Sequence, residues 1–118
     1  MSFVGGGSDL PSFYREYGGA VLSSAINAFV YIIVKKKFDD GFRLSYSETE
    51  NVLKASEIKH PILRNALKIC NFKEPIEIIS IADIPSSGTG LGSSSSFTVG
   101  LLKALKQFKN VDFKKREL

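Results

Sequence analysis

Residues 84–105 read IPSSGTGLGSSSSFTVGLLKAL, a glycine- and serine-rich stretch that turns abruptly apolar. A flexible linker is usually flanked by polar, unpatterned sequence. Here the strand-like run EPIEIISIAD leads into the stretch, and Phe97, Leu101 and Leu105 follow it at helical spacing. This context predicts a strand, a glycine loop and a helix start, an arrangement whose backbone N–H groups can hold a phosphate.

Two common glycine patterns do not fit this stretch. The Walker pattern needs a lysine after its last glycine, but Gly92 is followed by Ser93. The dinucleotide pattern can start at Gly88, but Ser93 stands at its third glycine, and no acidic residue follows a second strand about 20 positions on. A capped helix after a tight turn is the structural alternative, although capping needs fewer glycines and serines. We therefore predict an anion-binding loop of another kind.

The composition is that of an ordinary soluble globular domain. The 118 residues are 43% hydrophobic and 24% charged, with a net charge of +4. The apolar run AFVYIIV is far shorter than the roughly 20 residues of a membrane span, and the start lacks the pattern of a signal peptide. One cysteine, Cys70, excludes an internal disulfide. We expect a cytoplasmic protein without a membrane partner. The basic balance is compatible with a polyanion partner, but solvated surface charge is the favoured explanation.

The N-terminal half is predicted to hold a short helix and several strands. The helix lies in SDLPSFYREYGG, with Ser8 or Asp9 as its cap and Gly18 or Gly19 at its end. One or two strands follow, with a break near Asn27. A hairpin turn at DDG, residues 39–41, then returns the chain as the strand FRLSYS.

The C-terminal half is predicted to be a loop, a helix, a strand and a second helix. Residues 48–60 are polar and weakly patterned, which predicts a loop with a little helix. His60 is expected at the surface or at the start of the helix that Pro61 opens. An apolar stripe on that helix comprises Ile62, Leu63, Ala66, Leu67, Ile69 and Cys70. A further helix is predicted to begin at Asp112, close to the end of the given sequence. With only three apolar residues before the first glycine turn, both ends favour a fragment of a longer protein.

Two motifs resemble those of a known family. Pro85, Gly90-Leu91-Gly92 and Ser93-Ser94 are similar to the central motif of the GHMP kinases, which include galactokinase, homoserine kinase and mevalonate kinase. The stretch GGGSDLPSFYREYGG resembles the first motif of the sugar-kinase branch, and looks closest to the D-glycero-D-manno-heptose 7-phosphate kinases. The resemblance implies an ATP-dependent sugar kinase that phosphorylates a hydroxyl of heptose 7-phosphate.

The resemblance also implies a fold. The GHMP kinase N-terminal domain is α+β, with a mixed β-sheet, helices on one side and a left-handed β-α-β crossover, as in the second domain of a small-subunit ribosomal protein. Residues 1–118 would form this ATP-binding domain, incomplete at both ends, without the C-terminal GHMP domain.

Site residues follow from the same resemblance. The sugar acceptor would meet Gly6, Gly7, Ser8 and Asp9, where Asp9 can instead be a helix cap. Ser94 would also contact Mg²⁺. The phosphates of ATP would be wrapped by Ser87, Gly88, Thr89, Gly90, Leu91, Gly92, Ser93, Ser94 and Ser95. The family's basic and acidic catalytic residues would lie outside residues 1–118, so we expect this chain alone to have little or no turnover.

Two other functions stay open at this point. One is an RNA-binding module of the same architecture, and the other is a nucleotide-binding domain without catalysis. RNA readers stack aromatic side chains beside basic residues on an exposed face. The aromatic residues here fall mainly inside apolar strands, and the densest special chemistry is the glycine-serine loop. The sequence therefore favours the kinase and makes nucleic acid the less favoured partner, while the oligomeric state is open.

Overall fold

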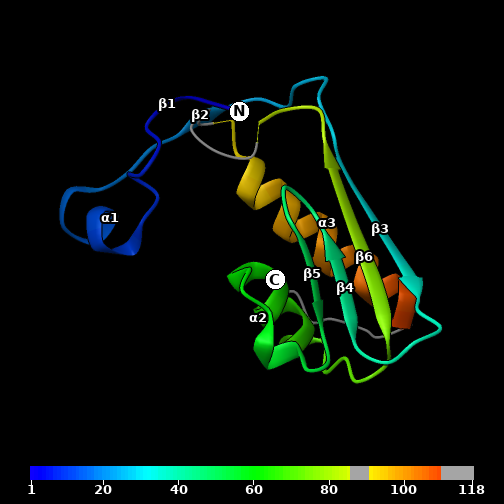
Figure 1. Ribbon diagram of the computed structural model, residues 1–118. Helices are drawn as coiled ribbons and strands as arrows, with labels where there is room; N and C mark the ends of the chain where they lie inside the picture. The colour runs from blue at the N-terminus through cyan, green and yellow to red at the C-terminus, as the bar shows by residue number, and fades with distance from the viewer. Residues whose placement is uncertain (86–90, 110–118) are drawn as a thin grey trace.

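The computed structural model describes residues 1–85 and 91–109 (Figure 1). Residues 86–90 and the helix predicted at Asp112 lie outside the described residues. The helices are α1 (Pro11–Tyr17), the short 3-10 helix η1 (Ala55–Glu57), α2 (Pro61–Ile69) and α3 (Ser93–Lys109). The strands are β1 (Ser2–Val4), β2 (Leu22–Ser23), β3 (Val30–Lys36), β4 (Phe42–Ser45), β5 (Thr49–Val52) and β6 (Ile76–Ala82).

A four-stranded mixed sheet forms the body of the molecule, in the order β3-β6-β4-β5. β6 runs antiparallel to β3, with Ile33 opposite Ile79, and parallel to β4, with Leu44 opposite Ile78. The predicted hairpin pairing across residues 39–41 is therefore wrong, because β6 inserts between β3 and β4. β6 is apolar on its covered face, and a central position satisfies the hydrogen-bonding groups on both its edges.

Both longer helices cover the same face of this sheet. Alternate residues of β4 and β6 are buried, and they meet the apolar sides of α2 and α3 in one core. The core residues are Phe42, Leu44, Ile58, Leu63, Ala66, Leu67, Cys70, Phe72, Ile76, Ile78, Leu101, Leu102 and Leu105. The α+β class with helices on one side is confirmed. β4 and the parallel β6 are joined through α2, and the left-handed sense of this crossover stays a prediction.

The start of α2 follows from local chemistry. Pro61 occupies the first turn, where its missing N–H costs nothing, and the His60 side chain accepts a hydrogen bond from the Leu63 N–H. The expected position of His60 at a helix start is confirmed. Ile69 is 56% exposed, so it does not belong to the buried stripe predicted for this helix.

Residues 1–24 form an arm that stands apart from the sheet (Figure 1). β1 and β2 pair antiparallel, and α1 lies between them in the chain. Gly5 is required here, because a Cβ at this position would overlap the Ala20 carbonyl oxygen. The predicted N-cap of α1 is wrong, because Leu10 is the N-cap residue and no side chain caps the helix, whereas the predicted end at Gly18 is confirmed.

Residues 48–60 hold a strand in addition to the loop and the short helix that the sequence predicts. β5 pairs with β4, with Glu50 opposite Leu44, and η1 follows it. The short strand TENV is mostly polar, so it lacks the alternation of apolar and polar residues by which a strand is usually predicted. Glu50 is nevertheless its buried residue, and this carboxylate proves central to the site below.

Candidate functional site

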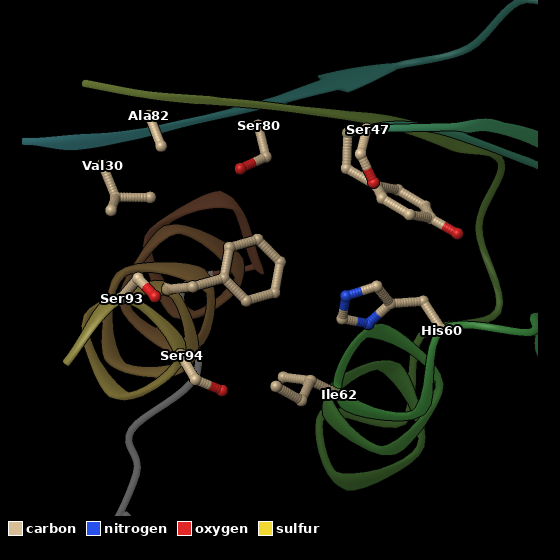
Figure 2. Close-up of a pocket in the computed structure, with 10 residues that line it drawn as sticks. Val30, Ser47, His60, Ile62, Ser80, Ala82, Ser93 and Ser94 are labelled. Carbon is tan, nitrogen blue, oxygen red and sulfur yellow. The ribbon is translucent and has the colours of Figure 1, made fainter. Parts of the chain in front are cut away.

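A cavity of about 400 Å³ opens where the starts of α2 and α3 face the covered side of the sheet. Figure 2 shows Ser93 and Ser94 on one helix, His60 and Ile62 on the other, and Val30, Ser80 and Ala82 on the strands above them. Tyr46, Ser47 and Phe97 complete the lining. The volume lies within the range of small-molecule sites, about 300–1,000 Å³.

The start of α3 lies directly after a glycine with an unusual backbone conformation. Gly92 has a φ of +76°, which L side chains rarely adopt, and its carbonyl accepts the N–H of Ser96 at 3.0 Å. The first turn carries no acidic residue, so nothing on it opposes the partial positive charge of a helix start. Ser94 is exposed on this turn and lines the cavity. These features suit an anion.

Three ring side chains form one wall of the cavity. The rings of Tyr46 and His60 are 4.8 Å apart in an edge-to-face arrangement, and those of His60 and Phe97 are 5.6 Å apart. Such centroid distances are favourable for ring packing. The wall therefore offers a planar ligand an aromatic surface beside the anion-suited helix start.

A buried carboxylate holds this wall in place. Glu50 is 7% exposed and accepts hydrogen bonds from the Lys59 N–H at 2.7 Å, the His60 N–H at 3.4 Å and the Tyr46 hydroxyl at 3.2 Å. Burial by itself raises the pKa of Glu50, but these hydrogen bonds outweigh it and leave that pKa lowered. Burial, followed by the adjacent Glu50 charge, raises the pKa of Tyr46, so its hydroxyl stays protonated as a donor.

A backbone clasp lies just before the glycine-serine stretch. The Phe29 N–H donates to Asp83 Oδ2, and the Asp83 N–H donates to the Phe29 carbonyl, both at 2.9 Å. Phe29 immediately precedes β3, and Asp83 immediately follows β6. The two ends of this strand pair are therefore fixed together two residues before Pro85.

A family model described as the GHMP kinases N terminal domain matches residues 52–118, more than half of the chain. The chain belongs to the GHMP kinase family. This agrees with a resemblance that rested on motifs in both halves of the sequence.

Individual relatives of this GHMP kinase domain include kinases of sugars and of mevalonate. The D-glycero-alpha-D-manno-heptose 7-phosphate kinase of Campylobacter jejuni is 28% identical over 130 residues, covering 100% of this chain and 38% of the relative. A D-glycero-D-manno-heptose 1-phosphate kinase from Bacteroides thetaiotaomicron has the same fold, with a TM-score of 0.79, 22% identity and coverage of 99% of this chain and 42% of that one. The mevalonate kinase of Methanococcus jannaschii aligns with a TM-score of 0.59 and 28% identity, over 75% of this chain and 33% of that one. The chain thus spans about two-fifths or less of the length of these proteins.

The phosphate-binding residues predicted for this GHMP kinase domain fall into two groups. Ser87, Gly88, Thr89 and Gly90 lie outside the described residues. Leu91 to Ser95 lie at the start of α3, where Ser93 and Ser94 line the cavity.

The predicted acceptor residues lie elsewhere, on the arm. The described residues that line the cavity do not include Gly6, Gly7, Ser8 or Asp9. Ser8 donates its hydroxyl to the carbonyls of Gly5 and Ala20, and Asp9 Oδ1 accepts the Gly7 N–H at 3.0 Å. Both side chains thus shape the glycine turn, and their role toward a sugar stays a prediction.

Several cavity residues were not predicted from the sequence. Tyr46, Ser47 and Ser80 belonged to no motif, Phe97 was expected only on the apolar side of a helix, and His60 was expected only at the surface or at a helix start. A signal did exist for Ser80, because it is polar within the apolar run IEIISIA. Tyr46 and Ser47 lie just after a short strand, at the kind of position that often carries function.

Metal-ligating groups are sparse in the part of the chain that the structure describes. Residues 1–85 and 91–109 contain no cluster of three or more His, Cys, Asp or Glu side chains that could hold a metal ion. A hydroxyl such as that of Ser94 is a hard oxygen donor of the type Mg²⁺ accepts, and Mg²⁺ at phosphate sites usually needs few protein ligands. Among the described helices, none has the length and apolar character needed to cross a bilayer.

Proposed function

We propose that the chain is the nucleotide-binding part of an ATP-dependent sugar kinase that transfers a phosphoryl group to a hydroxyl of a heptose phosphate. The observation that carries this proposal is the cavity, in which an aromatic wall adjoins a serine-rich helix start that follows a glycine. Membership of the GHMP kinases supports the nucleotide, and the Campylobacter jejuni relative supports the heptose phosphate.

The two halves of the cavity suit the two halves of ATP. The base packs against the ring side chains of His60 and Phe97. The phosphates lie at the start of α3, where backbone N–H groups and the helix dipole favour negative charge. Ser94 offers its hydroxyl to a phosphate oxygen or to Mg²⁺, and this donor fits either partner. The bound Mg²⁺ would supply neutralisation of phosphate charge.

The acceptor sugar is assigned to the arm. The glycine turn exposes Asp9, whose carboxylate can accept hydrogen bonds from sugar hydroxyls in addition to the one from Gly7. The arm would have to approach the start of α3 for in-line transfer, because the nucleophile and the phosphoryl group must be about 3–3.5 Å apart. We further propose that the protein is cytoplasmic and that this chain alone has little or no turnover.

The test combines binding with product formation. MgATP binding to the purified chain is measured by calorimetry, and transfer of labelled γ-phosphate is measured with the protein that carries the complete kinase sequence. Heptose 7-phosphate, heptose 1-phosphate and mevalonate are offered as acceptors in parallel. We expect binding by the chain and transfer to heptose 7-phosphate by the complete protein. Absence of MgATP binding overturns the nucleotide assignment, and transfer to mevalonate alone overturns the sugar.

One observation favours the RNA-binding alternative. On the sheet face that the helices leave uncovered, the rings of Phe29 and Tyr31 are 54% and 49% exposed, and their centroids are 6.2 Å apart. The nearby cations are partly neutralised, because Lys35 and Arg43 both pair with Glu77, at 2.8 Å and 3.5 Å. Single-stranded RNA is therefore tested at two salt concentrations beside MgATP. Tight, strongly salt-dependent RNA binding without MgATP binding would replace the kinase proposal.

A further inference from the structure

The two ring nitrogens of His60 have different surroundings. Nδ1 lies 3.4 Å from the Leu63 backbone nitrogen and accepts its N–H, which caps α2. Figure 2 shows the ring between Ile62 and Ser47, with its other nitrogen directed into the cavity. One nitrogen of the His60 ring therefore caps α2, and the other faces the proposed ligand.

The cap determines which nitrogen carries the proton. A nitrogen that accepts a hydrogen bond cannot itself be protonated, so in the neutral imidazole the proton is on Nε2. Burial lowers the pKa of His60, which favours this neutral form, although the nearby Glu50 charge acts in the opposite direction. The ring thus presents an N–H donor to the cavity.

The orientation of the ring is fixed from a second side. Glu50 accepts the His60 N–H at 3.4 Å and the Tyr46 hydroxyl at 3.2 Å, and the Tyr46 ring packs edge-to-face on His60. Phe97 contacts the ring from α3. Backbone, cap and two aromatic neighbours leave the imidazole little freedom to turn.

We propose that His60 is a specificity-determining residue, whose Nε2–H donates a hydrogen bond to a ring nitrogen of the purine base. This inference rests on the proposed function, because it takes the base to lie against the aromatic wall. Every ring nitrogen of adenine other than the glycosidic one is an acceptor, whereas the carbon of a deaza analogue is not. A fixed donor therefore distinguishes bases by where they carry an acceptor.

The test measures the affinities of ATP and of its 1-deaza, 3-deaza and 7-deaza analogues by calorimetry on the purified protein. For the wild type we expect one analogue to bind about five- to tenfold more weakly than ATP, as loss of a single net hydrogen bond implies. The other two should bind within about twofold of ATP.

Two variants separate the donor from the cap. His60→Asn keeps a favoured N-cap residue but is too short to place a donor where Nε2 lies. His60→Gln keeps an amide N–H near that place and gives up the cap. In His60→Asn the sensitive analogue should bind as ATP does, whereas His60→Gln should retain discrimination despite a less stable α2.

The outcomes distinguish the two proposals. If the wild type binds ATP and all three analogues equally, His60 is not a base-reading donor, while the nucleotide assignment stands. If His60→Asn discriminates as the wild type does, the donor is another group and the inference is wrong. If the wild type binds no ATP, the proposed function fails, and this inference fails with it.

Discussion

The carboxylate of Glu50 accepts a 2.7 Å hydrogen bond from the Lys59 backbone N–H, nine residues along the chain. Together with its bond from Tyr46, this contact joins the exit of β4 to the entrance of α2. Glu50→Gln places an amide NH₂ where one carboxylate oxygen accepts, and leaves a buried donor without an acceptor. We expect a loss of about 1–3 kcal/mol in the free energy of unfolding, measured by urea denaturation.

Glu48→Gln is the matched control for that change. Glu48 is exposed and two residues away, so its substitution should stay within about 0.5 kcal/mol. Equal effects of the two substitutions would show that the buried hydrogen bonds of Glu50 contribute nothing particular.

The stability of the protein should fall as His60 becomes protonated. Burial lowers the pKa of His60 below its ordinary value of about 6.5, so the unfolded state binds more protons between the folded and unfolded pKa values. This contribution is fully present above about pH 6.5 and is lost as the pH falls through the folded pKa. Urea unfolding of wild type and His60→Asn from pH 8 to pH 5 measures it.

Since the chain has one histidine, the comparison isolates a single group. The advantage of the wild type over His60→Asn should shrink as the pH falls. An advantage that is constant across this range would contradict the prediction.

Substitution of Gly92, at the start of α3, should lower the stability of the protein. Gly92→Ala meets no steric overlap, but its φ of +76° costs an L residue about 1–2 kcal/mol. We expect lower stability by this amount, measured by thermal unfolding, and weaker MgATP binding.

Gly100→Ala is the contrasting variant on the same helix. A Cβ there would lie 3.5 Å from Ile32 Cγ1, an ordinary contact, and alanine favours the helix interior over glycine. It should stabilise the protein by about 0.5–1 kcal/mol. A loss at Gly100 as large as that at Gly92 would show that packing, not backbone conformation, dominates at both sites.

Alanine substitutions at two apolar residues of α2 should differ sharply in their effect on stability. Leu67 is fully buried in the core, so Leu67→Ala should cost about 2–5 kcal/mol by urea unfolding. Ile69, two positions on, is 56% exposed, and Ile69→Ala should change stability by about 0.5 kcal/mol or less. A large loss at Ile69 would mean that its side chain is covered in solution.

Helices and strands with strong apolar periodicity were predictable from the sequence, whereas the pairing of the strands within the sheet was not. The stripe that contains Leu63 and Leu67 is decided locally, because burial follows the 3.6-residue period. That β6 inserts beside β3 depends on contacts about fifty residues apart in the chain, which local pattern does not encode. β5 escaped prediction because its buried residue, Glu50, is charged, and its burial depends on donors supplied by Lys59, His60 and Tyr46.

The candidate site, like the fold, was predictable from the sequence only in part. The position of the α3 serines at a helix start was predictable from the sequence, because they directly follow Gly92, and two of them line the cavity. The aromatic wall beside them is assembled from Tyr46 after β4, His60 before α2 and Phe97 on α3. Such a wall exists only once the sheet and both helices have packed.

The clasp between Phe29 and Asp83 has a mechanical consequence. Phe29 immediately precedes β3, on the chain that comes from the arm, and Asp83 lies two residues before Pro85 at the entry to the glycine-serine stretch. The chain that leads from the arm into β3 and the chain that leaves β6 toward Pro85 are therefore held to each other at this point.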